Sequence, residues 1–290
     1  MLKYEYHNLL ASKHIRSNLP KEKVLDCIDQ VKNAHLEIMA EHNANLLGFY
    51  DLPDCSTKHI DDFIANLNPV FDTMLVLGIG GSALGNKALY SALKTEAELP
   101  RKLFVYDNVD PVFLYEILSQ INLEKTLVNV ITKSGTTAET MAGYMIVADI
   151  IKRKFPKDYQ KRIIITTDKE KGFLRQVINQ EGYPGFTVPD NVGGRFSVLS
   201  DVGLLSSAFT GIDIKALLKG AKDMREICWN PNIWENPAYL NGLIHFLYYR
   251  QGKNISVMMP YSNSLYDLAD WYRQLWAESL RKRKDIKGRE

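Results

Sequence analysis

Short apolar runs alternate with longer segments of mixed polarity through the middle of the chain. The runs end in turn-forming residues, which is typical of strands buried on both faces of a sheet. The segments between them have the periodicity of helices. This pattern predicts an α/β fold with a doubly wound parallel sheet. The predicted strands lie at Met74–Leu77, Leu103–Tyr106, Thr126–Ile131 and Arg162–Thr166.

Helices are expected around these strands. Residues 21–44 place apolar side chains at near-helical spacing between polar ones, which predicts an amphipathic helix. Asp110 and Pro111 supply an N-cap and a first-turn proline for a helix after the second strand. Further helices are predicted over residues 84–93, 138–151 and 263–280.

The pattern divides the chain into three parts. Residues 1–68 form an N-terminal helical segment, and residues 69–210 form the first α/β domain. Residues 211–290 contain a helical connection and one more apolar run, Ile255–Met259, which predicts a further strand. Because a parallel sheet needs several strands, we expect these last residues to be the start of a second, incomplete α/β unit.

Composition excludes several classes of protein. Lys and Arg total 36 against 34 for Asp and Glu, and this balance argues against a dedicated nucleic-acid surface. Cys27, Cys55 and Cys228 have no ligand-like spacing, so neither a zinc site nor a disulfide framework is expected. No apolar run approaches the roughly 20 residues of a membrane helix, and the N-terminus lacks signal-peptide features. We therefore expect a cytoplasmic protein with no membrane partner.

The sequence GIGGS at residues 78–82 is the first candidate for binding a ligand. Glycines such as Gly81 allow a phosphate to approach the backbone closely, and Ser82 adds a hydroxyl donor. The same residues approximate a dinucleotide fingerprint, in which Asp107 would bind a ribose. A tight turn with no ligand is the third interpretation.

The sequence TKSGTT at residues 132–137 is more specific. It offers four hydroxyls and one ammonium group at a predicted junction between strand and helix. Hydroxyls can donate to phosphate oxygens, and Lys133 would add positive charge. A nicotinamide cofactor gives no reason for such a cluster, so a phosphate ligand is favoured.

Four segments in this order resemble the glucose-6-phosphate isomerase family: GIGGSALG, KSGTTAET, DNVGGRFSVLSDVGL and QLWAESL. The likeness runs from about Ala40 to Ser279. The family's SIS domains are doubly wound α/β units, so the resemblance implies that residues 69–210 form the first of these. It also implies an aldose–ketose isomerase of glycolysis and gluconeogenesis. Such an enzyme interconverts D-glucose 6-phosphate and D-fructose 6-phosphate through an enediol or enediolate, without a metal or organic cofactor.

The resemblance assigns a role to several residues. Glu278 would carry the proton between C2 and C1, and Arg195 would stabilise the charge of the enediolate. Gln274 lies four residues before Glu278, on the same helix face, and would contact the substrate near its phosphate. The residues implied in binding the hexose 6-phosphate are Gly81, Ser82, Thr132, Lys133, Ser134, Thr137 and Gln274.

The family also uses residues that have no counterpart in this sequence. Its ring-opening histidine comes from the C-terminal region across a homodimer interface, and a lysine near the C-terminus reaches the site. His245 lies in an apolar stretch and is expected in a core, and His42 is no better a candidate. We therefore expect these 290 residues alone to isomerise the closed-ring sugar poorly.

Two alternatives remain beside the isomerase. The first is a non-catalytic SIS module that binds sugar phosphates. Such a module needs the phosphate loops but neither Arg195 nor Glu278, so these two residues favour an enzyme. The second is a nicotinamide-dependent oxidoreductase built on GIGGS and Asp107, and the hydroxyl cluster counts against it.

Overall fold

The computed structural model describes residues 3–10, 19–94, 100–282 and 284. The chain forms two compact units. The helical unit combines Met1–Pro53 with Leu218–Val257, and the sheet unit combines Asp54–Leu217 with Met258–Glu290. Each unit therefore joins two separate segments, whereas the predicted division after residues 68 and 210 follows the chain. That division into SIS domains stays a prediction.

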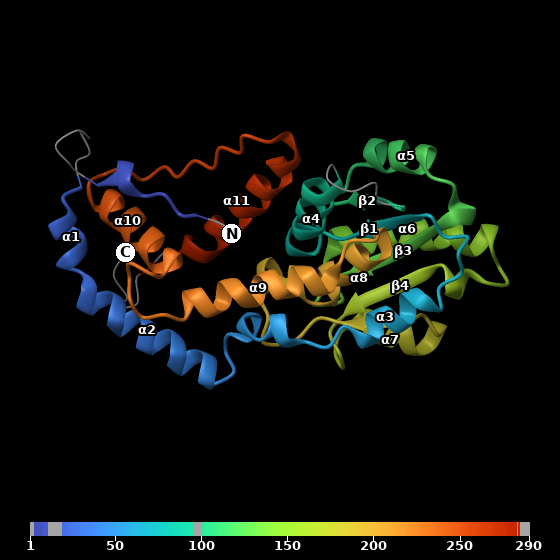
Figure 1. Ribbon diagram of the computed structural model, residues 1–290. Coiled ribbons are helices and arrows are strands. Elements are labelled where there is room, and N and C mark those ends of the chain that lie inside the picture. The colour runs from blue at the N-terminus through green and yellow to red at the C-terminus, as the bar shows by residue number, and fades with distance from the viewer. Residues whose placement is uncertain (1–2, 11–18, 95–99, 283, 285–290) are drawn as a thin grey trace. The chain divides into compact units, whose positions relative to one another are not determined.

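The sheet unit is built on one five-stranded sheet, and all its strand pairs are parallel, as predicted (Figure 1). Its strands are β1 (Thr73–Leu77), β2 (Lys102–Tyr106), β3 (Thr126–Ile131), β4 (Ile163–Thr167) and β5 (Gly185–Thr187). Their order across the sheet is β2-β1-β3-β4-β5. The four predicted strands agree with β1 to β4 to within one residue at each end. β5 was not predicted, because three residues that include a glycine carry no apolar pattern.

Helices follow the strands in the expected alternation. The sheet unit contains α3 (Lys58–Ala65), α4 (Leu84–Lys94), α5 (Pro111–Gln120), α6 (Ala138–Lys154), α7 (Phe173–Glu181), α8 (Asp201–Thr210) and α11 (Tyr266–Leu280). The predicted cap of α5 is confirmed, because the Asp110 carboxylate accepts hydrogen bonds from the backbone N–H groups of Val112 and Phe113 at 2.8 and 3.3 Å. Two short 3-10 turns follow strands of the sheet: η4 (Gly80–Ser82) comes after β1, and η7 (Gly194–Leu199) comes after β5.

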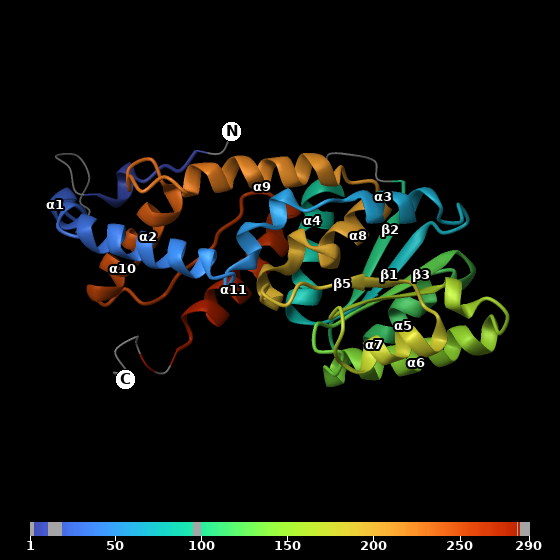
Figure 2. The same cartoon turned by 90° about the horizontal axis from the view of Figure 1, so that it is seen from below.

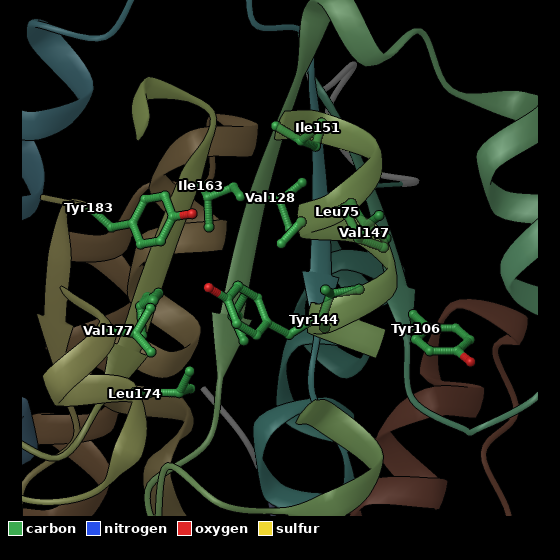
Figure 3. Packing of buried hydrophobic residues seen from close by; sticks show 14 of the residues in the cluster. Leu75, Tyr106, Val128, Tyr144, Val147, Ile151, Ile163, Leu174, Val177 and Tyr183 are labelled. Atoms are coloured by element: carbon green, nitrogen blue, oxygen red, sulfur yellow. The ribbon is translucent and has the colours of Figure 1, made fainter. Parts of the chain in front are cut away.

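One face of the sheet packs against α5, α6 and α7 through apolar side chains (Figures 2 and 3). Alternate strand residues such as Leu75, Val128 and Ile163 point to this face, and Val147 and Ile151 of α6 pack against them. The opposite face is covered by α3, α4 and α8, as Figure 2 shows. Because both faces of the sheet are covered, every residue of β1, β3 and β4 is buried, and these strands are mostly apolar along their length.

The prediction of a strand at Ile255–Met259 is wrong. In the described part of the chain these residues form no strand and have no β partner. Their side chains are mostly exposed, with Ile255 at 83% and Met259 at 66%. A parallel strand is stable only when neighbours satisfy its backbone groups, so an apolar run without neighbours stays irregular.

The helical unit has its own core. It contains α1 (Lys21–Leu25), α2 (Ile28–Asn43) and α10 (Pro237–Arg250), together with most of α9 (Ile214–Cys228), which begins in the sheet unit. Its buried residues come from the N-terminal segment and from α10, and they include Leu19, Val24, Leu240 and Ile244. None of the helices described is both long and apolar enough to cross a membrane.

Candidate active site

The two predicted phosphate loops lie side by side at the carboxyl edge of the sheet. They follow β1 and β3, which are neighbouring parallel strands. A Cβ atom built on Gly78 would lie 3.2 Å from the carbonyl oxygen of Ile131, at the end of β3. The topology therefore brings residues 78–82 and 132–137 to one place, where ligands of such sheets bind.

Three hydroxyls converge in the second loop. Thr132 Oγ1 lies 2.7 Å from Thr137 Oγ1, and Ser134 Oγ lies 3.3 Å from Thr137 Oγ1. Thr137 is the N-cap residue of α6, a helix of 17 residues, and it forms no side-chain capping bond. Gly135 has a positive φ of 68° and lies against the backbone of α7. The result is a cluster of donors at a helix N-terminus, an arrangement that favours an anion.

Lys133 points away from this cluster. Its ammonium group donates hydrogen bonds to the carbonyl oxygens of Asp190 and Val192 at 2.6 and 3.0 Å. These residues immediately precede the Gly193-Gly194-Arg195 segment, so Lys133 ties the phosphate loop to the loop that carries Arg195. Its predicted contact with the substrate stays a prediction.

Asp168 and Asp190 form a carboxyl pair that was not predicted from the sequence, and Asp190 lies in the loop that leads to Arg195. The Asp168 carboxylate accepts hydrogen bonds from the backbone N–H groups of Glu170 and Lys171, both at 2.8 Å, and a further bond from the Asp190 carboxyl. These bonds, led by that of Glu170, lower the pKa of Asp168 to about 2. The bond to Asp168 and its negative charge raise the pKa of Asp190. The sequence signal that could have identified this pair is Asp168 itself, an aspartate that directly follows the apolar strand β4.

Gly81 brings the first phosphate loop against the arginine loop. A Cβ atom at Gly81 would lie 2.2 Å from the carbonyl oxygen of Gly194. No side chain fits there, because such a contact is far shorter than van der Waals distance. Ser82 and Arg195 are thus carried by two turns, η4 and η7, that touch through glycine backbone.

Arg195 is held by helix α11 on both its side chain and its backbone. Its Nε donates to Ser279 Oγ at 3.0 Å, and its Nη1 lies 3.9 Å from Glu278 Oε2. The indole N–H of Trp271 donates to the Arg195 carbonyl at 3.2 Å. The guanidinium also lies over the Phe196 ring, 4.3 Å from its centroid. The structure therefore brings Arg195 and Glu278 together, although 83 positions of sequence separate them.

Gln274 joins Glu278 as the helical spacing predicts. Its Nε2 donates to Glu278 Oε1 at 2.9 Å. Its Oε1 is buried and has no hydrogen-bond partner among the described residues. A Cβ atom on Gly80 would lie 2.9 Å from Gln274 Nε2, so this amide lies against the first phosphate loop. A buried acceptor without a donor fits a site that a ligand hydroxyl would complete.

The remaining candidates have hydrogen-bond or ion-pair partners of their own. Asp107, the ribose acid of the dinucleotide interpretation, pairs with Lys87 at 3.1 Å. His245 Nδ1 donates to the Asn241 carbonyl oxygen within α10 at 2.9 Å, and His42 Nε2 lies 2.9 Å from Asp51 Oδ1. Among the described residues, no group of three or more His, Cys, Asp or Glu side chains is arranged to hold a metal ion.

The chain resembles known isomerases over nearly its whole length. A glucose-6-phosphate isomerase from Carboxydothermus hydrogenoformans is 41% identical over 100% of this chain and 65% of that protein. A probable glucose-6-phosphate isomerase from Methanococcus maripaludis is 39% identical over 97% of this chain and 64% of that protein. The chain therefore spans about two thirds of the length of these curated relatives.

Solved structures agree with this relationship. The fold matches a hypothetical protein from Thermus thermophilus with a TM-score of 0.82 and 34% identity, over 93% of this chain and 64% of that chain. It matches a glucose-6-phosphate isomerase from Chlamydia trachomatis with a TM-score of 0.74 and 28% identity, over 81% of this chain and 45% of that chain. The sequence model described as phosphoglucose isomerase matches residues 65–290. This chain belongs to the phosphoglucose isomerase family.

Proposed function

We propose that this protein is an aldose–ketose isomerase that interconverts D-glucose 6-phosphate and D-fructose 6-phosphate. The observation that carries the proposal is the pairing of Arg195 with Glu278, whose charged atoms lie 3.9 Å apart beside the two phosphate loops. A module that only binds sugar phosphates has no use for a carboxylate held next to a guanidinium. The names of the similar proteins support the same activity.

The phosphate of the hexose would bind at the junction of the two loops. Ser82, Thr132, Ser134 and Thr137 supply hydroxyl donors there, and the N-terminus of α6 adds its partial positive charge. This end of the substrate makes no covalent change. Its role is to hold C1 and C2 at a fixed distance from the anchored phosphate.

Proton transfer would take place at the other end of the open-chain sugar. The Glu278 carboxylate removes the proton from C2, the C–H electron pair forms the C1–C2 double bond, and the aldehyde oxygen becomes negatively charged. Arg195 stabilises this enediolate, because its fixed guanidinium faces the developing charge without having to reorganise. The hydroxyl proton on O2 passes to O1 within the enediolate, Glu278 returns the carbon proton to C1, and O2 becomes the ketone oxygen while O1 becomes a hydroxyl.

The bond between Gln274 and Glu278 keeps the carboxylate in place. Gln274 Nε2 donates a hydrogen bond to Glu278 Oε1, which leaves Glu278 Oε2 on the side of Arg195. The unpartnered Gln274 Oε1 supports a contact with a substrate hydroxyl. Both side chains project from one face of α11, so a single helix would set the position of the base and of this contact.

Replacing Glu278 tests the proposal. In an isomerase assay coupled to product oxidation, Glu278→Gln is expected to lower the rate by roughly two to four orders of magnitude, since the general base is lost while its shape remains. Affinity for glucose 6-phosphate, measured by calorimetry, should change little. Glu116→Gln, on the exposed side of α5, is the matched control and should retain the activity of the unmodified protein.

Other outcomes would contradict the isomerase. Binding of glucose 6-phosphate with no turnover in any assembly of the protein would favour the non-catalytic module. Binding of NAD with no response to sugar phosphate would favour the oxidoreductase.

We also infer, from the resemblance alone, a homodimer that works in the cytoplasm. Light scattering on a size-exclusion column measures the first, and cell fractionation the second. A strictly monomeric active protein would contradict the dimer.

A further inference from the structure

Asn86, in the first turn of α4, uses its whole side-chain amide to link two other elements. It is 2% exposed. Its Nδ2 donates to the carbonyl oxygen of Ser82 at 3.0 Å, and its Oδ1 accepts a hydrogen bond from the hydroxyl of Ser206 on α8. Ser206 is 1% exposed, and its Oγ also lies 3.1 Å from the Gly203 carbonyl oxygen, although its single proton is directed at Asn86. The two side chains therefore form a buried link from the end of η4 to α8.

Tight backbone packing surrounds this link. Val198, in the turn η7 that carries Arg195, lies between α4 and α8. A Cβ atom on Gly85 would lie 2.7 Å from the Val198 side chain, and one on Gly203 would lie 2.2 Å from the Val198 carbonyl oxygen. The first turn of α4, the arginine turn and α8 thus meet without room for another methyl group.

We propose that Asn86 and Ser206 are positioning residues of the hexose-phosphate site, because their hydrogen bond fixes the Ser82 turn relative to the Arg195 turn. This inference rests on the proposed function, in which the two turns bind opposite ends of one substrate. Contacts between glycines and a valine have no preferred direction, so they allow the two turns to slide. A hydrogen bond between buried groups has a fixed geometry, and each group is costly to leave without a partner.

The position of Asn86 explains why the effect would reach the ligand. Ser82 is the last residue of η4, and its carbonyl oxygen faces the Asn86 amide. Fixing this peptide group fixes the Ser82 hydroxyl that is proposed to bind phosphate. On the other side, Ser206 belongs to α8, which follows η7 with only Ser200 between them. Neither residue needs to touch the substrate.

Ser206→Ala tests this role with little change in shape. The substitution removes the donor and leaves Asn86 Oδ1 buried without a partner. We expect the dissociation constant for glucose 6-phosphate to rise about tenfold, which corresponds to the loss of one buried hydrogen bond. Ser207→Ala is the matched control. Ser207 lies on the same helix and is 3% exposed, and its hydroxyl makes no hydrogen bond to α4 in the described chain. It should leave the constant within about twofold.

A double-mutant cycle with Ser82→Ala separates positioning from general stability. If Ser206 acts through the Ser82 turn, Ser206→Ala should weaken binding much less when Ser82 is already alanine. A purely structural effect would lower affinity by the same factor in both backgrounds, and that result would overturn the proposal.

Hydrogen exchange in the ligand-free protein tests the link between the two turns independently of the proposed isomerase activity. The backbone N–H groups of Phe196 and Ser200 donate to the Gly193 and Ser197 carbonyls in the arginine turn. We expect them to exchange faster in Ser206→Ala but not in Ser207→Ala. Unchanged exchange would overturn the link between the two turns. Failure of the unmodified protein to bind any hexose phosphate, with exchange as expected, would instead reject the proposed function and keep the link.

Discussion

The two faces of the sheet are built differently. The face under α5, α6 and α7 is mainly apolar, with Leu75, Val130 and Ile165 packed on helix residues such as Val147, and its buried threonines Thr126 and Thr167 lie at strand ends. The face under α3, α4 and α8 includes buried polar groups. These are Asn86, Asn129, Thr166, Ser206, Ser207 and Thr210, none of them more than 3% exposed.

The two faces of the sheet serve different purposes. Apolar burial stabilises the sheet but is indifferent to small shifts, since its free energy follows area rather than direction. Hydrogen bonds between buried groups specify one arrangement, although their net stabilisation is modest. The polar face carries the turns η4 and η7, so the elements that need exact placement lie on the face with directional contacts.

The largest effect is expected on the apolar face. Ile151→Ala removes a fully buried side chain of α6 and should lower the free energy of unfolding by about 3 kcal/mol, through lost burial and the cavity left behind. Hexose-phosphate affinity at low temperature should stay unchanged, because Ile151 lies near the C-terminal end of α6, whereas the proposed phosphate site lies at the N-terminus of this helix. Urea denaturation and calorimetry measure the two quantities. Met145→Ala, on the same helix but 61% exposed, is the control and should change stability little. A large loss of affinity in folded Ile151→Ala would show that apolar packing also positions the binding site.

A smaller loss of stability but a larger loss of binding is expected on the polar face. Gly203→Ala places a Cβ atom 2.2 Å from the Val198 carbonyl, so α8 must move away from the arginine turn. Overpacking of this kind costs roughly 1–3 kcal/mol. Denaturation and hexose-phosphate titration of the same sample should both show a decrease. Gly220→Ala, at a helix position with nothing within 4 Å, should instead stabilise by about 0.5–1 kcal/mol. Binding that survives Gly203→Ala unchanged would show that the arginine turn does not depend on α8.

Much of the sheet unit follows from sequence, since buried parallel strands leave long apolar runs. The meeting of the two phosphate loops follows as well, because neighbouring parallel strands end at one edge of the sheet, whereas the roles of Arg195, Gln274 and Glu278 came from the family resemblance and stay predictions. The direction of Lys133 does not follow, since a lysine after a strand can reach a ligand or a neighbouring carbonyl equally well. The link between Asn86 and Ser206 joins residues 120 positions apart, and no local pattern reports such a pair. The strand predicted at Ile255–Met259 is wrong for a related reason. Whether an apolar run forms a strand depends on neighbouring strands, which the local sequence does not show.

The smallest effect should come from a second polar pair on the same face, inside the sheet. Thr166 Oγ1 of β4 donates to Asn129 Oδ1 of β3 at 2.9 Å, and both residues are fully buried. Asn129 Nδ2 has no partner among the described residues. Thr166→Val keeps the shape of the side chain but leaves the whole Asn129 amide without a hydrogen bond, which should cost about 1–2 kcal/mol.

Removing both polar groups of this pair should restore most of the stability that Thr166→Val loses. In the double variant Asn129→Val, Thr166→Val, no buried polar side-chain atom of the pair is left without a partner. The double variant should therefore be more stable than Thr166→Val alone and lie within about 1 kcal/mol of the unmodified protein, by urea denaturation. Its affinity for hexose phosphate should be unchanged, because neither side chain forms a hydrogen bond to η4 or η7 in the described part of the chain. A double variant that is stable but binds weakly would mean that polar groups on this face position the site collectively. Normal binding, set against the loss expected for Ser206→Ala, would confine that role to the link made by Asn86.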